Sequence, residues 1–169
     1  MLRKLSLVFA ICVLASVSAR AQSFRASSLD VWGGYSYLRF RGTPAGNFNG
    51  WELGGQYKFK SWLGAVADLG GNYGSPTGVG SSVRSYLFGP QVSFPARVSP
   101  FAHVLFGVGH FSQGSFHDTS FSAGYGFGID TKVAPSISWR IIQGDVIHTH
   151  FFGTTQNDLR LSTGIVIHF

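Results

Sequence analysis

Two residues in the middle of the chain have the types and spacing of a hydrolytic pair. His110 and Ser112 are two positions apart, and a histidine beside a serine can activate the hydroxyl as a nucleophile. In a strand both side chains would face the same side. No orienting carboxylate accompanies them, because Glu52, the only glutamate, has the opposite facing and Asp118 lies in a predicted loop. An enzyme built on this pair stays an alternative, and we assign no catalytic residue.

A second pair has the spacing of metal ligands. His148 and His150 would project from one face of a strand, and two imidazoles so placed can bind zinc. No cysteine and no third ligand lie nearby. Two histidines at a membrane interface fit the same spacing, so we predict no metal site and no cofactor.

Charged side chains of both signs lie at the polar positions of segments in which apolar and polar residues alternate. If that parity faces an enclosed interior, these side chains should form ion pairs with one another. They are Glu52, Lys58, Lys60, Asp68, Asp130, Arg140, Asp145 and Arg160.

Eight segments that alternate apolar and polar residues would position these side chains. Period-two alternation indicates β-strands, and none of the segments carries a helical stripe. The segments cover residues 31–38, 51–60, 63–70, 86–94, 102–109, 121–130, 137–149 and 159–169.

Two of these segments contain irregularities. Pro90 lacks an N–H, so it weakens the fourth segment or marks a bulge. In the seventh segment, Arg140 has one parity while Gln143 and Asp145 have the other. A bulge near residues 141–142 would bring all three to one face.

The two faces of these segments indicate which side meets lipid. One face is apolar and rich in aromatic residues, and the other carries small and polar residues such as Gly54, Gly64, Gly70, Gly107, Gly124, Gly126 and Gly128. Only 12% of the chain is charged, which is too little for a soluble surface. The apolar face should therefore point outward into lipid and the polar face inward, in a closed barrel that leaves no edge unpaired.

The connections between segments alternate in length. The odd-numbered ones are longer and rich in small polar residues, as in YGSPTGVGSS, whereas KSW, PARVSP and TKVAP are tighter. This asymmetry is typical of an up-and-down barrel with short periplasmic turns and longer outer loops. Aromatic residues near segment ends, Trp51, Phe59, Trp62, Phe94 and Phe169, are expected to form interfacial girdles.

The first 21 residues have the pattern of a secretory signal peptide. Arg3 and Lys4 precede an apolar run over residues 5–17, which is followed by a small-x-small site at residues 19–21. The run is too short to span a membrane as a helix. We therefore predict a signal peptide over residues 1–21 and one barrel domain over residues 22–169.

Cleavage after residue 21 would change the chemistry of the chain. It removes Cys12, the only cysteine, and lowers the net charge from +6 to +3. No basic cluster remains, so we expect no nucleic-acid partner.

The whole mature chain resembles the small eight-stranded outer-membrane barrels of Gram-negative bacteria, the OmpA/OmpX type or porin-like β-barrel domain. The resemblance rests on the signal peptide, the eight alternating segments and the terminal GIVIHF that ends in Phe169. It implies an all-β, antiparallel, up-and-down barrel in the outer membrane. It also implies that Phe169 is an assembly signal read by the barrel-insertion machinery, in addition to a girdle residue.

These observations predict a monomeric, non-enzymatic barrel without an open pore, in contact with outer-membrane lipid and lipopolysaccharide. Its role would lie in envelope integrity, surface interaction or adhesion. Two alternatives stay open. Lipid A deacylases are barrels of this size that use a His-x-Ser pair, which His110 and Ser112 resemble. A secreted lipocalin-like barrel would instead hold an apolar ligand.

Overall fold

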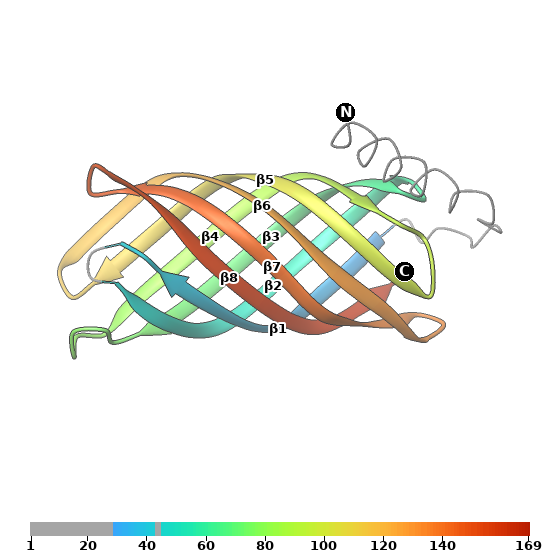
Figure 1. Cartoon of the computed structure of the whole chain (residues 1–169), viewed down its shortest axis with the longest axis horizontal. Helices are drawn as coiled ribbons and strands as arrows, with labels where there is room; N and C mark the ends of the chain where they lie inside the picture. The colour runs from blue at the N-terminus through green and yellow to red at the C-terminus, as the bar shows by residue number, and fades with distance from the viewer. Residues whose placement is uncertain (1–28, 43–44) are drawn as a thin grey trace, which may run out of the picture.

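Eight antiparallel strands form one closed barrel (Figure 1). The computed structural model describes residues 29–42 and 45–169; the predicted signal peptide lies outside the described residues. The strands are β1 (Leu29–Phe40), β2 (Gly46–Lys60), β3 (Leu63–Gly74), β4 (Ser81–Ser93), β5 (Val98–Gln113), β6 (Phe116–Ala134), β7 (Ile137–Phe151) and β8 (Thr154–His168). No helix long and apolar enough to span a membrane occurs among these described residues. The predicted fold class is confirmed.

The first and last strands close the barrel. Their pairing runs from Asp30 opposite His168 to Arg39 opposite Leu159, as the alternation of the terminal segment predicts. Beyond the last pair, the N–H of Phe169 donates to the carbonyl of Leu29 over 2.9 Å. The closure therefore reaches Phe169 at the end where β1 begins and β8 ends, and it pairs the two strands from there as far as Arg39 and Leu159.

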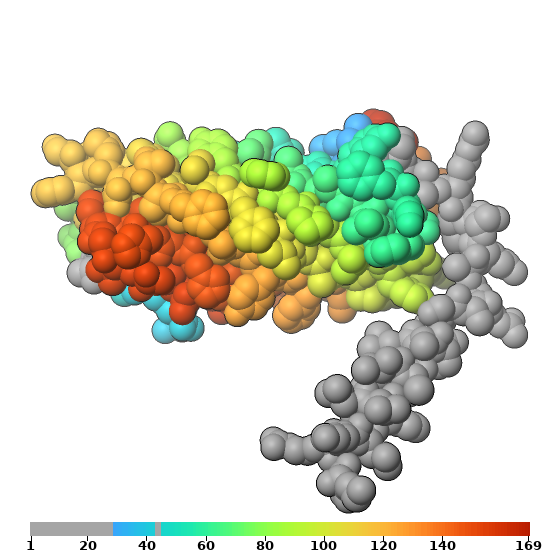
Figure 2. Space-filling view, turned by 90° about the horizontal axis from the view of Figure 1, so that it is seen from above, coloured from blue at the N-terminus to red at the C-terminus, as the bar shows by residue number. Residues whose placement is uncertain are grey.

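Each strand turns its apolar side outward along the middle of its length. On β2, Leu53 and Tyr57 are exposed, whereas Glu52 and Gln56, each one residue before them, are buried. Ile165 on β8 is exposed as well. The space-filling view shows the strands as oblique bands around an elongated body (Figure 2). The predicted outward facing of the apolar side is therefore confirmed. Polar groups fill much of the lumen, together with a buried apolar cluster of Trp32, Val66, Leu87, Leu105, Ile147 and Val166.

Glycines on the inward side make room for large lumen side chains. A Cβ atom at Gly54 would lie 2.2 Å from the Trp32 ring, and one at Gly126 would lie 1.9 Å from Asp145 Oδ1. Neither position tolerates a side chain unless its neighbour moves. The inward glycines thus set the space in which the lumen residues meet.

The predicted irregularities have different outcomes. The register of β7 against β8 shifts between Arg140 and Gln143, and Ile141 and Ile142 are both exposed, so the predicted bulge is confirmed. No bulge occurs at Pro90: it pairs with Ala65 on one side, and the β4–β5 register is the same before and after it. The β4–β5 pairing is instead interrupted at Gly89 and Pro90, in agreement with the predicted weakening of this segment.

Two of the four expected long outer loops, residues 41–45 and 75–80, are the longest connections of the barrel. The other two are mostly strand, and for these the expectation was wrong. The connection between β5 and β6 is residues 114–115, and the one between β7 and β8 is Phe152 and Gly153, both with positive φ angles. These connections are as short as residues 61–62 between β2 and β3. Each of these hairpins continues as sheet beyond the apolar band, because water outside the membrane still permits a paired ladder. We call the end of the barrel that carries the β5–β6 and β7–β8 connections the far end. The opposite end, where β1 begins and β8 ends, is the terminal end.

We predict that a polar substitution lowers the free energy of unfolding more on the lipid-facing side of β2 than on its lumen side. Leu53→Lys should destabilise the barrel by about 2–4 kcal/mol, because the lysine would enter hydrocarbon near the middle of the bilayer. Gln56→Asn, on the lumen side of the same strand, should cost about 1 kcal/mol through its hydrogen bond with Gln91. Urea unfolding in lipid vesicles measures both. Equal costs at the two positions would mean that the assigned facing is inverted.

Candidate functional site

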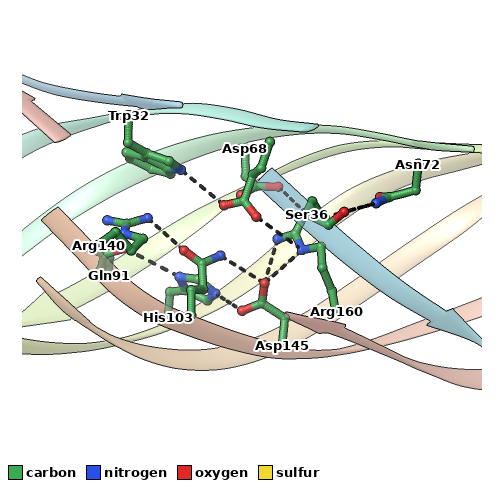
Figure 3. A network of polar contacts seen from close by, with 11 residues as sticks. Trp32, Ser36, Asp68, Asn72, Gln91, His103, Arg140, Asp145 and Arg160 are labelled. Atoms are coloured by element: carbon green, nitrogen blue, oxygen red, sulfur yellow. Dashed lines mark hydrogen bonds and ion pairs between the residues drawn. The ribbon is translucent and has the colours of Figure 1, made fainter. Parts of the chain in front are cut away.

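Arg160 stands at the centre of the lumen and binds carboxylates from three directions (Figure 3). Its Nη1 lies 2.7 Å from Asp68 Oδ1, and its Nη2 lies 2.7 Å from Asp145 Oδ2. Glu52 Oε2 is 3.6 Å from Arg160 Nε. The Arg160 side chain is only 1% exposed, so these ion pairs are shielded from solvent. Together these four residues cross-link β2, β3, β7 and β8 through the interior.

Two further residues extend this lumen network around Asp145. His103 Nε2 lies 2.9 Å from Asp145 Oδ1, which ties β5 to β7. Gln143 donates from Nε2 to Asp145 Oδ2 over 2.9 Å and accepts from Arg140 Nη1 over 2.7 Å. Asp145 therefore accepts from three side chains, and its charge is held by Arg160 and by polar hydrogens.

A second layer of side chains surrounds Arg140, between the lumen network and the terminal end. Its guanidinium lies 4.4 Å from the centre of the Trp32 ring and 4.3 Å from that of Phe101, in cation–π contact with both. It also donates to both oxygens of Asp130, at 2.9 and 3.1 Å. The bulge at residues 141–142 turns Arg140 inward, so this layer depends on that irregularity.

A cavity of about 550 Å³ opens at the terminal end. Its wall includes Asp30, which lies 2.5 Å from Lys58 Nζ and 2.8 Å from His168 Nδ1. His168 Nε2 is in turn 2.7 Å from Ser138 Oγ. At the terminal end these contacts join the two closing strands to each other, β1 to β2 and β8 to β7.

The far end of the lumen is closed by an apolar cluster that we call the far plug. It comprises Leu38, Phe40, Phe48, Val83, Phe111 and Phe151. The rings of Phe40 and Phe111 stack with centroids 5.2 Å apart, and Phe48 is fully buried. Between the two ends the lumen is therefore filled by aromatic and paired polar side chains.

The sequence pattern missed the far plug because the two faces exchange their chemistry at the far end. On β2, Phe48 faces the lumen while Asn47 and Asn49 on either side are exposed. On β5, Phe111 faces the lumen between His110 and Ser112. Parity continues along each strand, but the outside changes from lipid to water, so the apolar side chains turn inward.

Seven of the eight predicted lumen charges face the lumen. Six of them form two groups, and the seventh lies apart from both. Glu52, Asp68, Asp145 and Arg160 meet in the lumen network, Asp130 and Arg140 form their own pair, and Lys58 lies at the terminal cavity. Lys60 was also expected inside, and that was wrong. The register shifts between Lys58 and Lys60, so Lys60 is exposed with its ammonium 5.6 Å from the centre of the Trp62 ring.

Three lumen residues that the sequence analysis left out take part in these contacts. Asp30 and Asp158 lie one residue beyond segments whose ends were set too short, and His103 has inward parity but was not counted among the charges. Asp158 accepts from the backbone N–H of Arg41 over 2.7 Å. Extending the parity to the true strand ends would have found the first two.

The two candidate pairs of the sequence analysis, His110 with Ser112 and His148 with His150, lie on the outer surface of the far end. His110 Nδ1 is 2.7 Å from Thr119 Oγ1, and the ring of His110 stacks on that of His117. Asp118 accepts from the N–H groups of Thr119 and Phe152, so its contacts are with backbone. The orienting contact to His110 thus comes from a hydroxyl.

The other histidine pair contacts amide and hydroxyl side chains. His148 hydrogen-bonds Asn157, and His150 Nδ1 lies 2.9 Å from Thr155 Oγ1. Within residues 29–42 and 45–169, no three histidine, cysteine or acidic side chains gather in a way that could hold a metal ion.

Comparisons with known proteins agree with this architecture. The family model of the outer membrane protein beta-barrel domain matches residues 7–169. The chain belongs to this family. It is therefore an outer-membrane protein that crosses the bilayer with β-strands, and the soluble lipocalin-like alternative was wrong. No curated protein matches the sequence.

Solved structures of low sequence identity share the fold. Neisserial surface protein A is 13% identical with a TM-score of 0.68, over 85% of this chain and 98% of that one. Ail, the attachment invasion locus protein of Yersinia pestis, is 19% identical with a TM-score of 0.56, over 82% and 97%. A de novo designed transmembrane β-barrel is 16% identical with a TM-score of 0.53, over 88% and 100%. Because a designed barrel is similar too, this likeness speaks for the fold and not for a partner.

We predict that Arg160 is the residue on which the lumen network depends most. Arg160→Met should destabilise the barrel by about 3–5 kcal/mol, because it leaves buried carboxylates without their cation. Adding Asp68→Asn to Arg160→Met should recover part of that loss, since one uncompensated carboxylate is removed. Arg39→Gln, an exposed arginine on β1, is the matched control and should change stability by less than about 0.5 kcal/mol.

Unfolding midpoints of the four proteins in lipid vesicles test this. A loss for Arg160→Met no larger than that for Arg39→Gln would show that the network does not stabilise the barrel.

Proposed function

We propose that this protein is a sealed, non-enzymatic outer-membrane barrel that acts through its scaffold and its far end, in envelope integrity or attachment at the cell surface. The observation that carries the proposal is the filled lumen, with the far plug, the lumen network and the Arg140 layer in series. An eight-stranded barrel has an interior just wide enough for such side chains. With the interior filled, the outer surface is what the barrel offers to partners.

Orientation follows from the proposed assembly. We place the terminal end in the periplasm and the far end outside the cell, as the turn asymmetry of such barrels implies. The far end then presents strand extensions and short turns. Two of the similar structures belong to proteins named for the cell surface and for attachment, and surface interaction is for this chain a proposal in the same direction.

The proposal includes a monomer in direct contact with outer-membrane lipid and lipopolysaccharide, without a cofactor. Support for a monomer comes from the closed ladder, in which every strand already has two neighbours. A nonenzymatic role fits the surroundings of His110, whose contacts are with Thr119 and His117.

We predict that the wild-type barrel does not conduct ions. Purified protein inserted into planar bilayers at 100 mV should give no steady current, because the three filled layers lie in series along the lumen. A general porin in the same bilayer is the positive control. A stable, reproducible open level for the wild-type protein would contradict the sealed barrel.

We also propose that Phe169 is the assembly signal read by the insertion machinery. Its side chain is 67% exposed at the terminal end, where it can contact both lipid and a partner. Deleting Phe169 should cost the finished barrel only about 1–3 kcal/mol of apolar burial, so refolding into detergent micelles should succeed.

In cells, the same deletion should prevent insertion. Outer-membrane fractionation measures the insertion. The control is Phe59→Ala, which removes an exposed aromatic ring from the same end of the barrel. Normal insertion of the truncated chain would reduce Phe169 to an ordinary girdle residue.

A further inference from the structure

A basic surface lies on the outside of β4, β5 and β6, directly above the apolar band. Arg84 is exposed and pairs across the strands with His110. The rings of His110 and His117 stack nearly parallel, with centroids 6.1 Å apart and planes 9° apart. We call these three residues the collar site.

The depth of the collar site follows from the lipid-facing positions of β4. Val92, Phe88 and Tyr86 are exposed apolar or aromatic side chains in that order along the strand, and Arg84 is the next outward position. The exposed ring of Phe94 lies two residues beyond Val92. The ten residues from Phe94 to Arg84, at about 3.3 Å each and tilted by about 40°, span roughly 25 Å, the height of the apolar band of such barrels. Arg84 therefore lies where the hydrocarbon ends and the headgroups begin.

The cross-strand neighbours of Arg84 carry no acidic group. Arg84 pairs with Gly71 on β3 and with His110 on β5, and the ring of His117 stacks on that of His110. Asp118, which follows His117 in the sequence, accepts from the backbone N–H groups of Thr119 on β6 and of Phe152 in the β7–β8 connection. An anion supplied from outside would balance the collar site.

The donors of the collar site suit a phosphate group. Arginine presents a planar fork that binds phosphate oxygens in pairs. His110 keeps Nδ1 against Thr119, so its Nε2 is the ring nitrogen left for a ligand. Ser82 and Ser112 pair with each other one step farther from the membrane and add two hydroxyl groups beside the same spot.

We propose that the collar site binds a phosphate group on the sugar headgroup of lipid A in the outer leaflet. The proposal rests on the orientation given under the proposed function, since only the outer leaflet supplies this headgroup at the far end. It adds a specific ligand and specific contacts to the general contact with lipid. Headgroup phosphate and basic side chains meet at this depth in a membrane interface.

Lipid A binding to the purified full-length barrel in detergent micelles tests this, with native mass spectrometry as the readout. The probes are bisphosphorylated lipid A, dephosphorylated lipid A and inorganic phosphate. Arg84→Gln should weaken binding of the bisphosphorylated form about tenfold, the effect of one charge-assisted hydrogen-bonding group. Lys60→Gln is the matched control: it removes an exposed cation at the terminal end and should change binding less than about twofold, because it lies at the opposite end of the barrel from the collar site.

The remaining arms separate the possible outcomes. Dephosphorylated lipid A should bind wild type and Arg84→Gln equally, and His110→Gln should weaken the bisphosphorylated form in the same direction as Arg84→Gln. Equal effects of Arg84→Gln and Lys60→Gln would overturn the proposal. So would an Arg84-dependent affinity for inorganic phosphate as high as that for lipid A, because the site would then serve a soluble anion.

Two controls keep the result interpretable. Unchanged circular dichroism and melting of Arg84→Gln show that the barrel is folded, as expected for an exposed side chain. Failure of the collar site would leave the sealed barrel standing, since conductance tests that claim without reference to lipid A.

Discussion

The closed hydrogen-bonded ladder between β1 and β8 is the constraint on which the rest of the structure depends. Inside hydrocarbon, each backbone N–H or C=O without a partner costs several kcal/mol, so the sheet must close on itself. Once it is closed, strand geometry assigns alternate residues to the inside and the outside. Lipid then selects apolar side chains outside, and the narrow interior selects side chains that can fill it and satisfy one another.

The lumen meets this requirement in three different ways along one axis. Near the far end the far plug fills it with stacked rings, in the middle Arg160 gathers three carboxylates, and toward the terminal end Arg140 lies between two aromatic rings. Glycines opposite the bulky residues provide the space, as Gly54 does for Trp32. At the far end, where the outside changes from lipid to water, the plug consists of apolar side chains alone. Elsewhere in the lumen, polar groups share the space with an apolar cluster that includes Val66, Leu87 and Leu105. On a strand such as β2, apolar side chains thus face outward within the membrane, as Leu53 does, and inward beyond it, as Phe48 does.

Much of this structure could be predicted from the sequence, because successive residues of a strand face opposite sides of the sheet. Alternation alone predicted eight strands, the closing pair and the inward facing of Glu52, and the conflicting parity of Arg140 and Gln143 predicted the bulge between them. Strand ends could not be predicted in the same way, because beyond the membrane the apolar side turns inward and Phe48 and Phe111 look out of phase. The partners of Arg160 were equally inaccessible: Asp68 is 92 residues away, and which strands meet across the lumen depends on the stagger of the whole barrel. The outward position of Lys60 follows from a register shift that no residue type in the segment marks.

The central claim is that the facing of each strand is fixed by closure and that its chemistry inverts at the far end. Single spin-labelled cysteines along β2 test it most directly, in a chain whose only cysteine precedes residue 22. Oxygen in the bilayer should reach labels at Leu53 and Tyr57, and a water-soluble nickel reagent should reach labels at Asn47 and Asn49. Labels at Phe48 and Gln56 should be accessible to neither. A label at Phe48 that is open to the water-soluble reagent, or at Gln56 that is open to oxygen, would contradict the account.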